Sequence, residues 1–197
     1  RNTPLAEKYR MPAMILSDGT MGQMMEPVIL PEPHESHIDK PWAVTGTQMK
    51  RRHNIVNSLY LDPAELEKTN IERFERYKLI EENEARYESF MTEDAEIVVV
   101  AFGIAARVSK NAVAAARKEG IKAGLIRPIT VWPFPKKPIS ELAEKVKGFI
   151  SVELSMGQMI EDIKLAENCI RPVELCFRAG GMIPSPHRPF CPQSRVR

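Results

Sequence analysis

The spacing of apolar residues changes along this chain at about residue 95. Downstream of that point, short continuous apolar runs alternate with segments of helical periodicity. The runs cover Glu96–Ala101, Lys122–Ile126, Phe149–Val152 and Val173–Phe177. Continuous runs rich in β-branched residues are typical of central strands that are buried on both faces. We therefore expect four strands, joined by right-handed helical crossovers, in a mainly parallel sheet.

The segments between these runs predict helices. The first begins at Gly103 and ends at Gly120, because glycine commonly follows the last residue of a helix. Its expected apolar face comprises Ile104, Val108, Ala112 and Ala115. Two further helices are expected at Ser140–Val146 and at residues 156–167. Residues 95–186 are therefore predicted to form a three-layer α/β/α domain.

The part before residue 95 is less regular. Leu5–Tyr9 indicates the tail of a helix, and Ala13–Leu16 indicates a buried strand. Four prolines between Pro27 and Pro41 predict an extended connector. We assign residues 1–41 to an incomplete domain with its connector, residues 42–94 to a linker, and residues 187–197 to a disordered tail.

The linker contains one long predicted helix. Asp62 is suited to cap it, Pro63 suits its first position, and Glu65 completes a capping-box spacing. The helix is expected to run to about Met91, with a mostly charged and solvated surface.

One short motif occurs twice. Thr20–Glu26 reads TMGQMME, and Ser155–Glu161 reads SMGQMIE. Each copy follows an apolar run, so both are expected to be equivalent strand-turn-helix corners. Ligands and partners gather at the carboxyl ends of strands in open α/β sheets, so both copies are placed where function is common.

Composition narrows the functional classes. The formal net charge of +2 gives no electrostatic support for binding nucleic acid or a membrane surface. No apolar run approaches the length of a membrane span. The three cysteines have no C-x-x-C spacing, which argues against a disulfide framework, a zinc site or an iron–sulfur cluster held by this chain alone. We expect a cytoplasmic protein with no metal site of its own.

These motifs together carry a specific resemblance. Residues 95–183 resemble the transketolase C-terminal type of domain in thiamine diphosphate enzymes, with Leu125–Pro135 as its strand-Arg-turn-Pro signature. More narrowly, nearly the whole chain resembles the α subunit of 2-oxoacid:ferredoxin oxidoreductases, especially the 2-ketoisovalerate type. The matching segments are Ile15–Gly19, Met21–Pro27, Asn57–Pro63, Glu153–Met159 and Gly180–Pro184. Residues 1–41 then resemble the end of a pyrimidine-binding domain.

The resemblance implies a function for a larger assembly. Such complexes oxidatively decarboxylate a 2-oxoacid to acyl-CoA and reduce ferredoxin, using thiamine diphosphate, Mg²⁺, coenzyme A and iron–sulfur clusters. The resemblance places the glutamate that contacts the aminopyrimidine outside this chain, and the Gly-Asp-Gly motif for magnesium and diphosphate in the β subunit. The implied partners are β and γ/δ subunits, with ferredoxin reached through the complex and dimerisation expected. The chain alone should hold no cofactor, carry no catalytic residue and be inactive.

Five residues are candidates for a cofactor cleft or a subunit contact. They are Gly22, Gln23, Arg127, Gly157 and Gln158. Packing explains most glycines and methionines at such corners, so Gly22, Gly157 and the methionines Met21, Met24, Met156 and Met159 are first expected to serve the core. The alternative gives the glutamines and the helix amino ends a ligand or a subunit. Arg127 suits a structural ion pair, or else a carboxylate or coenzyme phosphate.

Other functions stay open at this level. The chain could be a non-catalytic α/β module that binds coenzyme A or another anion, or a dimerisation domain. The loop Trp132–Pro135 is apolar and stiff, and it either caps the core or forms an assembly surface; its prolines favour assembly because they reduce the entropy lost on docking.

Overall fold

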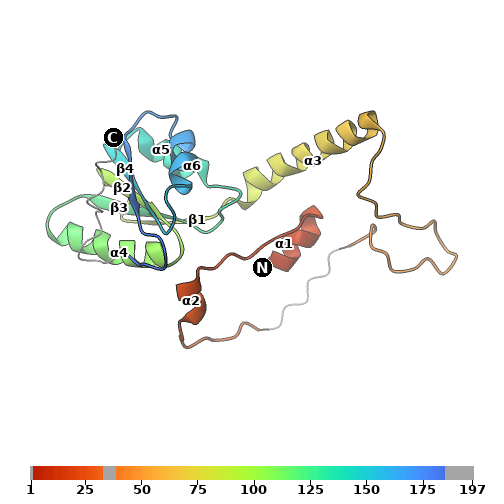
Figure 1. Cartoon of the computed structure of the whole chain (residues 1–197), viewed down its shortest axis with the longest axis horizontal. Helices are drawn as coiled ribbons and strands as arrows, with labels where there is room; N and C mark the ends of the chain where they lie inside the picture. The colour runs from red at the N-terminus through yellow and green to blue at the C-terminus, as the bar shows by residue number, and fades with distance from the viewer. Residues whose placement is uncertain (1, 33–38, 185–197) are drawn as a thin grey trace. The chain divides into compact units, whose positions relative to one another are not determined.

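The computed structural model describes residues 2–32 and 39–184, and the tail at 187–197 lies outside them. The chain divides into two compact units (Figure 1). Unit 1 comprises the residues up to Leu16 together with Met25–Glu82, and unit 2 comprises Ser17–Met24 with the described residues from Asn83 onward. Within the described part, no helix is long and apolar enough to cross a membrane.

Unit 2 is built on a five-stranded sheet. Its strands are β1 (Tyr87–Phe90), β2 (Ile97–Ala101), β3 (Ala123–Pro128), β4 (Gly148–Glu153) and β5 (Val173–Phe177). The spatial order is β1-β3-β2-β4-β5, with every neighbouring pair parallel except β1 and β3. The expected mainly parallel sheet is therefore confirmed.

Helices cover both faces of this sheet, as Figure 1 shows. On one face, α5 (Lys136–Ala143) and α6 (Met159–Ala166) pack Ile139 and Ile163 against Val98, Val100 and Phe149. On the other face, α4 (Gly103–Lys118) packs its alanines and Val113 against Val99 and Leu125. The alternation along β2 sends successive side chains into two separate cores, which confirms the three-layer α/β/α prediction.

The buried face of α4 differs from the expected one. Its buried residues are Ile104, Ala105, Ala106, Ser109 and Val113, whereas Val108 and Ala112 are half-buried and Ala115 is exposed. The helix is alanine-rich, so side-chain size does not distinguish its faces, and contact with the sheet fixes its rotation. Its end was predicted correctly: Gly120 has φ +83° and follows the final turn.

The described part of unit 1 consists of two helices with long connecting segments. These helices are α1 (Asn2–Tyr9) and α3 (Pro63–Glu84), whose last two residues belong to unit 2. Asp62 caps α3 as predicted, because its carboxylate accepts a hydrogen bond of 2.9 Å from the Ala64 N–H. Glu7 of α1 forms an ion pair with Lys40, and the Arg10 guanidinium lies 5.0 Å from the centre of the Trp42 ring.

Two predicted elements of the amino-terminal half are wrong. Ala13–Leu16 is extended but is not a strand, and Met14, Ile15 and Leu16 are all exposed. A strand requires a hydrogen-bonding neighbour, and none pairs with this segment among the described residues. The long helix ends at Glu84 rather than near Met91, because Tyr87–Phe90 pairs antiparallel with β3 as an edge strand.

Two residues of α6 that differ in burial provide a test of this core. Ile163 is fully buried beneath the sheet, whereas Leu165 is 73% exposed on the same helix. We expect Ile163→Ala to lower the free energy of unfolding by ~2–5 kcal/mol, because it removes buried methyl groups and leaves a cavity. Leu165→Ala should change it by less than ~0.5 kcal/mol. Urea unfolding followed by circular dichroism measures both, and equal losses would contradict this account of the core.

Candidate functional site

The strand order creates a crevice in unit 2. From β2 the chain crosses through α4 to β3 on one side, and from β3 it crosses through α5 to β4 on the other side of β2. The direction of winding therefore reverses between β2 and β4, and ligand sites of open α/β sheets lie outside the carboxyl ends of such strands. We call the segments that follow Ala101, Pro128, Glu153 and Phe177 the carboxyl edge.

A buried carboxylate organises the carboxyl edge after β4. Glu153 is only 3% exposed. Its Oε2 accepts hydrogen bonds from Ser155 Oγ (2.8 Å) and from the N–H groups of Gln158 (2.8 Å) and Met159 (3.0 Å). Its Oε1 accepts from Ser151 Oγ (2.8 Å) and the Ile160 N–H (2.9 Å). One side chain therefore satisfies three amide groups at the start of α6.

These hydrogen bonds determine the charge of Glu153. Burial by itself favours the neutral acid, but the donated hydrogen bonds from the Gln158 N–H, the Ser151 and Ser155 hydroxyls and the Met159 N–H outweigh it and hold the pKa of Glu153 below its usual range. The side chain is thus an ionised acceptor whose oxygens are already occupied. It also fills the amino end of α6, which leaves that helix end poorly suited to a bound anion.

The second motif copy forms a bend at Ser155–Gln158, followed by the first residues of α6, Met159–Glu161. The expected helix at 156–167 begins instead at Met159, because Gly157 has φ +108°, a conformation that side-chain-bearing residues rarely adopt. A Cβ at Gly157 would lie 3.1 Å from Leu175 Cδ2. Packing therefore accounts for Gly157, as first expected. Met159 is buried in the core, whereas Met156 and Gln158 are exposed.

The first motif copy has a different structure. It forms the short helix α2 (Gly19–Gln23), so the prediction that the two copies are equivalent corners is wrong. A Cβ at Gly22 would meet no atom within 4 Å, and Gln23 is exposed, so packing does not explain Gly22. Met21 and Met24 are also exposed rather than in the core.

The two copies share a position that motif reading missed. Asp18 precedes Thr20 by two residues, as Glu153 precedes Ser155, so each copy has a carboxylate at the same place. Asp18 Oδ1 accepts a hydrogen bond of 2.8 Å from the Met21 N–H, and Oδ2 accepts one of 3.1 Å from the Ile104 N–H at the start of α4. Extending the repeat backwards by two residues would have revealed this acidic position.

Arg127 makes the structural contact that its sequence position suggested. Its Nη1 lies 2.9 Å from Glu88 Oε2 in the paired edge strand β1. Both side chains are about half exposed, so the pair contributes less than ~1 kcal/mol. A ligand role for Arg127 would compete with this pairing.

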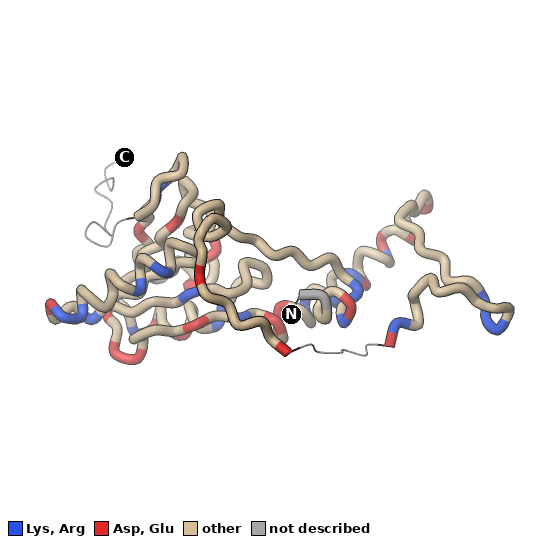
Figure 2. The backbone as a smooth tube through the Cα atoms, turned by 90° about the horizontal axis from the view of Figure 1, so that it is seen from below, with Lys and Arg blue, Asp and Glu red and all other residues tan. Residues whose placement is uncertain are grey.

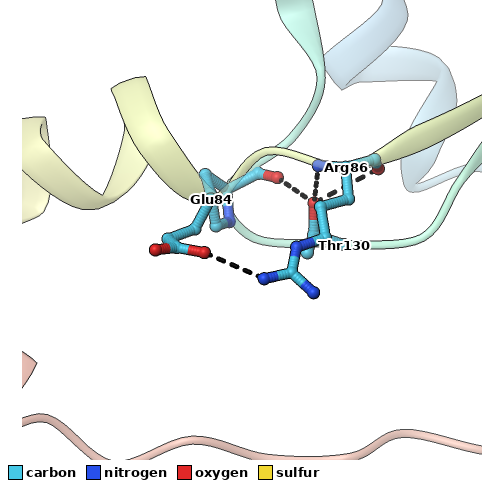
Figure 3. A network of polar contacts seen from close by, with 4 residues as sticks. Glu84, Arg86 and Thr130 are labelled. Carbon is cyan, nitrogen blue, oxygen red and sulfur yellow. Dashed lines mark hydrogen bonds and ion pairs between the residues drawn. The ribbon is translucent and has the colours of Figure 1, made fainter. Parts of the chain in front are cut away.

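A polar network that sequence reasoning missed holds the loop after β3 (Figure 3). Thr130 Oγ1 accepts a hydrogen bond from the Arg86 N–H (2.9 Å) and donates one to the Pro133 carbonyl (2.8 Å). The Arg86 guanidinium in turn pairs with Glu84 at 3.0 Å. The network fixes the loop Trp132–Pro135, in which Phe134 is buried in the core and Trp132 is 54% exposed. The loop therefore both caps the core and presents an aromatic surface.

Replacing Glu153 tests its role as a cap. We expect Glu153→Gln to lower the free energy of unfolding by at least ~2 kcal/mol, because an amide accepts fewer hydrogen bonds and leaves buried donors unsatisfied. Glu161→Gln, at an exposed carboxylate in the first turn of the same helix, is the matched control and should have little effect.

The same variant has a defined pH dependence. Because the folded pKa of Glu153 is lowered, its contribution is complete above the unfolded carboxyl pKa of ~4.3 and is lost as pH falls through the folded pKa. The stability difference between wild type and Glu153→Gln should therefore shrink on acidification below that value. Urea midpoints measured from pH 7 to pH 3 test this, and a pH-independent difference would contradict the assigned charge.

Known proteins match this chain in sequence and in fold. Residues 95–188 match the family model described as pyruvate:ferredoxin oxidoreductase core domain II. The chain is 54% identical over 178 residues to ketoisovalerate oxidoreductase subunit VorB of Methanothermobacter marburgensis, covering 90% of this chain and 50% of that protein. It is 52% identical, with the same coverages, to the VorB subunit of Methanothermobacter thermautotrophicus.

A solved structure of 2-oxoglutarate:ferredoxin oxidoreductase from Magnetococcus marinus resembles the fold. The TM-score is 0.56 at 22% identity, over 65% of this chain and 22% of that chain, and this likeness bears on the fold alone. The chain spans about half the length of the curated relatives it matches. The chain is therefore similar to subunits of 2-oxoacid:ferredoxin oxidoreductases, the resemblance that its motifs indicated.

Proposed function

We propose that this chain is the carboxyl-terminal part of the α subunit of a 2-oxoacid:ferredoxin oxidoreductase, where it serves assembly and shapes the cofactor cleft. The proposed reaction of the complete complex is oxidative decarboxylation of a branched 2-oxoacid, 2-ketoisovalerate, to acyl-CoA with reduction of ferredoxin. The support for this substrate is the 54% identity to a ketoisovalerate oxidoreductase subunit. The proposed partners are a β subunit, which carries the diphosphate-binding motif, and γ/δ subunits.

The described residues do not fit a complete site for thiamine diphosphate and Mg²⁺. The oxygens of Glu153 and Asp18 at the carboxyl edge already accept backbone or hydroxyl hydrogen bonds. In the part of the chain that the structure covers, no three side chains of His, Cys, Asp or Glu gather to hold a metal ion. We assign no chemical step to this chain, and we propose that the cofactor is held by other parts of the complex.

The observation that carries the assembly role is the apolar character of the carboxyl edge. Each segment that follows a parallel strand exposes large apolar side chains. They are Phe102 after β2, Ile129, Val131 and Trp132 after β3, Met156 after β4, and Met182 and Ile183 after β5. A row of this kind at one edge is typical of a surface that another protein covers. Methionines adapt to a partner, and tryptophans are common hot spots.

Charge gives no competing interpretation of unit 2. Figure 2 shows lysine and arginine interspersed with aspartate and glutamate along its elements, without a long stretch of one sign. The formal net charge of the whole chain is +2. A surface for nucleic acid or anionic lipid would instead need clustered basic residues. The apolar carboxyl edge, rather than a charged patch, is therefore the surface of unit 2 that supports a partner-binding role.

A double substitution tests the assembly role. Trp132→Glu with Met156→Glu places two charges on the carboxyl edge, and we expect it to weaken capture of a co-expressed β subunit at least tenfold. Leu165→Glu, at an equally exposed apolar residue of α6, is the control and should leave capture unchanged. The proposal fails if the wild-type chain does not capture the β subunit, or if both variants bind it as the wild type does. Circular dichroism confirms that the variants fold.

Activity assays address the division of labour. The purified chain with thiamine diphosphate, Mg²⁺ and an artificial electron acceptor should not decarboxylate 2-ketoisovalerate, because the described residues offer no complete cofactor site. The reaction should appear when the complete α subunit is assembled with its partner subunits. Decarboxylation by the isolated chain above the rate of a denatured sample would contradict the proposed role.

A further inference from the structure

We propose that Asp18 is a positioning residue that docks the first motif copy onto the carboxyl edge. The docked piece, Ser17–Met24, is called the docking segment. It belongs to unit 2, although the residues on either side of it belong to unit 1. Docking would make both motif copies parts of one partner-facing surface. This last step rests on the proposed assembly function, whereas the docking contact itself does not.

The carboxylate of Asp18 joins two helices. Oδ1 caps α2 within the docking segment by accepting the Met21 N–H, and Oδ2 reaches the Ile104 N–H, 86 residues further along the chain. The residue at the N-cap of α4, Phe102, forms no side-chain cap with this helix. Asp18 therefore supplies from a distant segment the acceptor that a local serine or aspartate commonly provides.

Gly103 is shaped to receive this contact. A Cβ placed on Gly103 would lie 2.8 Å from Asp18 Oδ2, a distance that real Cβ atoms essentially never show. Gly103 also has φ +59°, which strains any residue with a side chain. The close approach and the turn thus both require glycine, and the carboxylate lies directly against the glycine backbone.

Two methionines of the docking segment extend the contact with α4. Met21 Sδ lies 4.0 Å from the position of a Cβ on Gly103, and Met24 Sδ lies 3.8 Å from Arg107 Nη1. These sulfur contacts are weak, so the hydrogen bond from the Ile104 N–H to Asp18 Oδ2 is the strongest of the described contacts between the segment and α4. The segment therefore lies at the carboxyl end of β2, and the second copy follows the neighbouring strand β4.

The second copy needs no such bridge. Glu153 is in the sheet, and the backbone N–H groups that donate hydrogen bonds to it are all within seven residues of it. The second copy of the motif is therefore an integral part of the fold. The first copy is attached to the fold through one side chain, that of Asp18. Removing one acceptor oxygen from Asp18 should release the first copy without disturbing the second.

Hydrogen exchange on the 197-residue chain tests the docking contact. Asp18→Asn keeps one acceptor oxygen, which is expected to stay with the local Met21 N–H, so that the Ile104 N–H loses its acceptor and the segment is released. We expect exchange to become at least ~5-fold faster both at residues 17–24 and at Ile104, with residues 153–166 unchanged. Gly103→Ala should release the same peptides from the other side, and Asp18→Glu, which keeps both oxygens, should retain part of the protection.

A second capping aspartate provides the matched control. Asp62 caps α3 by accepting a hydrogen bond from the Ala64 N–H, which lies in the helix that directly follows it. Asp62→Asn should change exchange at the start of α3 and leave residues 17–24 and 103–107 as in the wild type. Docking through Asp18 is overturned if Asp18→Asn leaves Ile104 exchange unchanged, or if it speeds exchange evenly throughout unit 2.

Capture of the β subunit tests the shared partner-facing surface separately from the docking contact. Asp18→Asn should weaken capture, because half of the shared surface is released. If exchange changes as expected but Asp18→Asn captures the β subunit as tightly as the wild type, the shared surface is overturned while docking stands. If even the wild type captures nothing, the assembly function fails, and the exchange result still decides the docking contact.

Discussion

The starts of α4 and α6 both present backbone amides that need an acceptor from outside the helix. The first N–H groups of a helix have no acceptor within it, and the centre of this sheet is buried on both faces, so water is not an easy substitute. Glu153 meets this constraint at the start of α6, and Asp18 meets it at the start of α4. The arrangement of the carboxyl edge depends on these two carboxylates.

This requirement accounts for most residues of the second motif copy. Around the second copy, Glu153 provides the hydrogen-bond acceptors. Ser155 and Gly157 form the turn, and the Met159 side chain is buried in the core. Most residues of the second copy are thereby used for building the corner. Met156 and Gln158 remain at the surface, so these are the positions of the second copy with freedom to contact a partner.

The regular part of the fold could be predicted from sequence because its signals are local. β5 lies where its apolar run predicted, and Gly120 follows α4 as expected. The failures involve distant contacts. Tyr87–Phe90 continues the pattern of a charged helix, yet it pairs with β3, whose residues lie about 40 positions away. Likewise, Ala13–Leu16 has strand-like composition, but composition cannot supply a neighbouring strand.

Only part of the candidate site could be predicted from sequence. The motif, the stiff Trp132 loop and the Arg127 ion pair could be inferred from neighbouring residues. The Thr130 network and the Asp18 bridge could not, because each joins residues more than 40 positions apart whose types alone are unremarkable for loops. Folding brings them together only after the sheet has set the positions of β3 and α4.

The two motif copies also differ in the sequence separation between the residues whose hydrogen bonds hold them, and this separation affects how each copy forms during folding. The Glu153 cap closes a loop of five to seven residues, whereas the Asp18 bond to Ile104 closes one of 86. Closing the longer loop costs about 2.5 kcal/mol more in chain entropy. On a ribosome, Asp18 emerges long before its donor partner, the Ile104 N–H, exists. The corner after β4 needs only neighbouring residues to form, whereas the first copy attaches only once the start of α4 is in place.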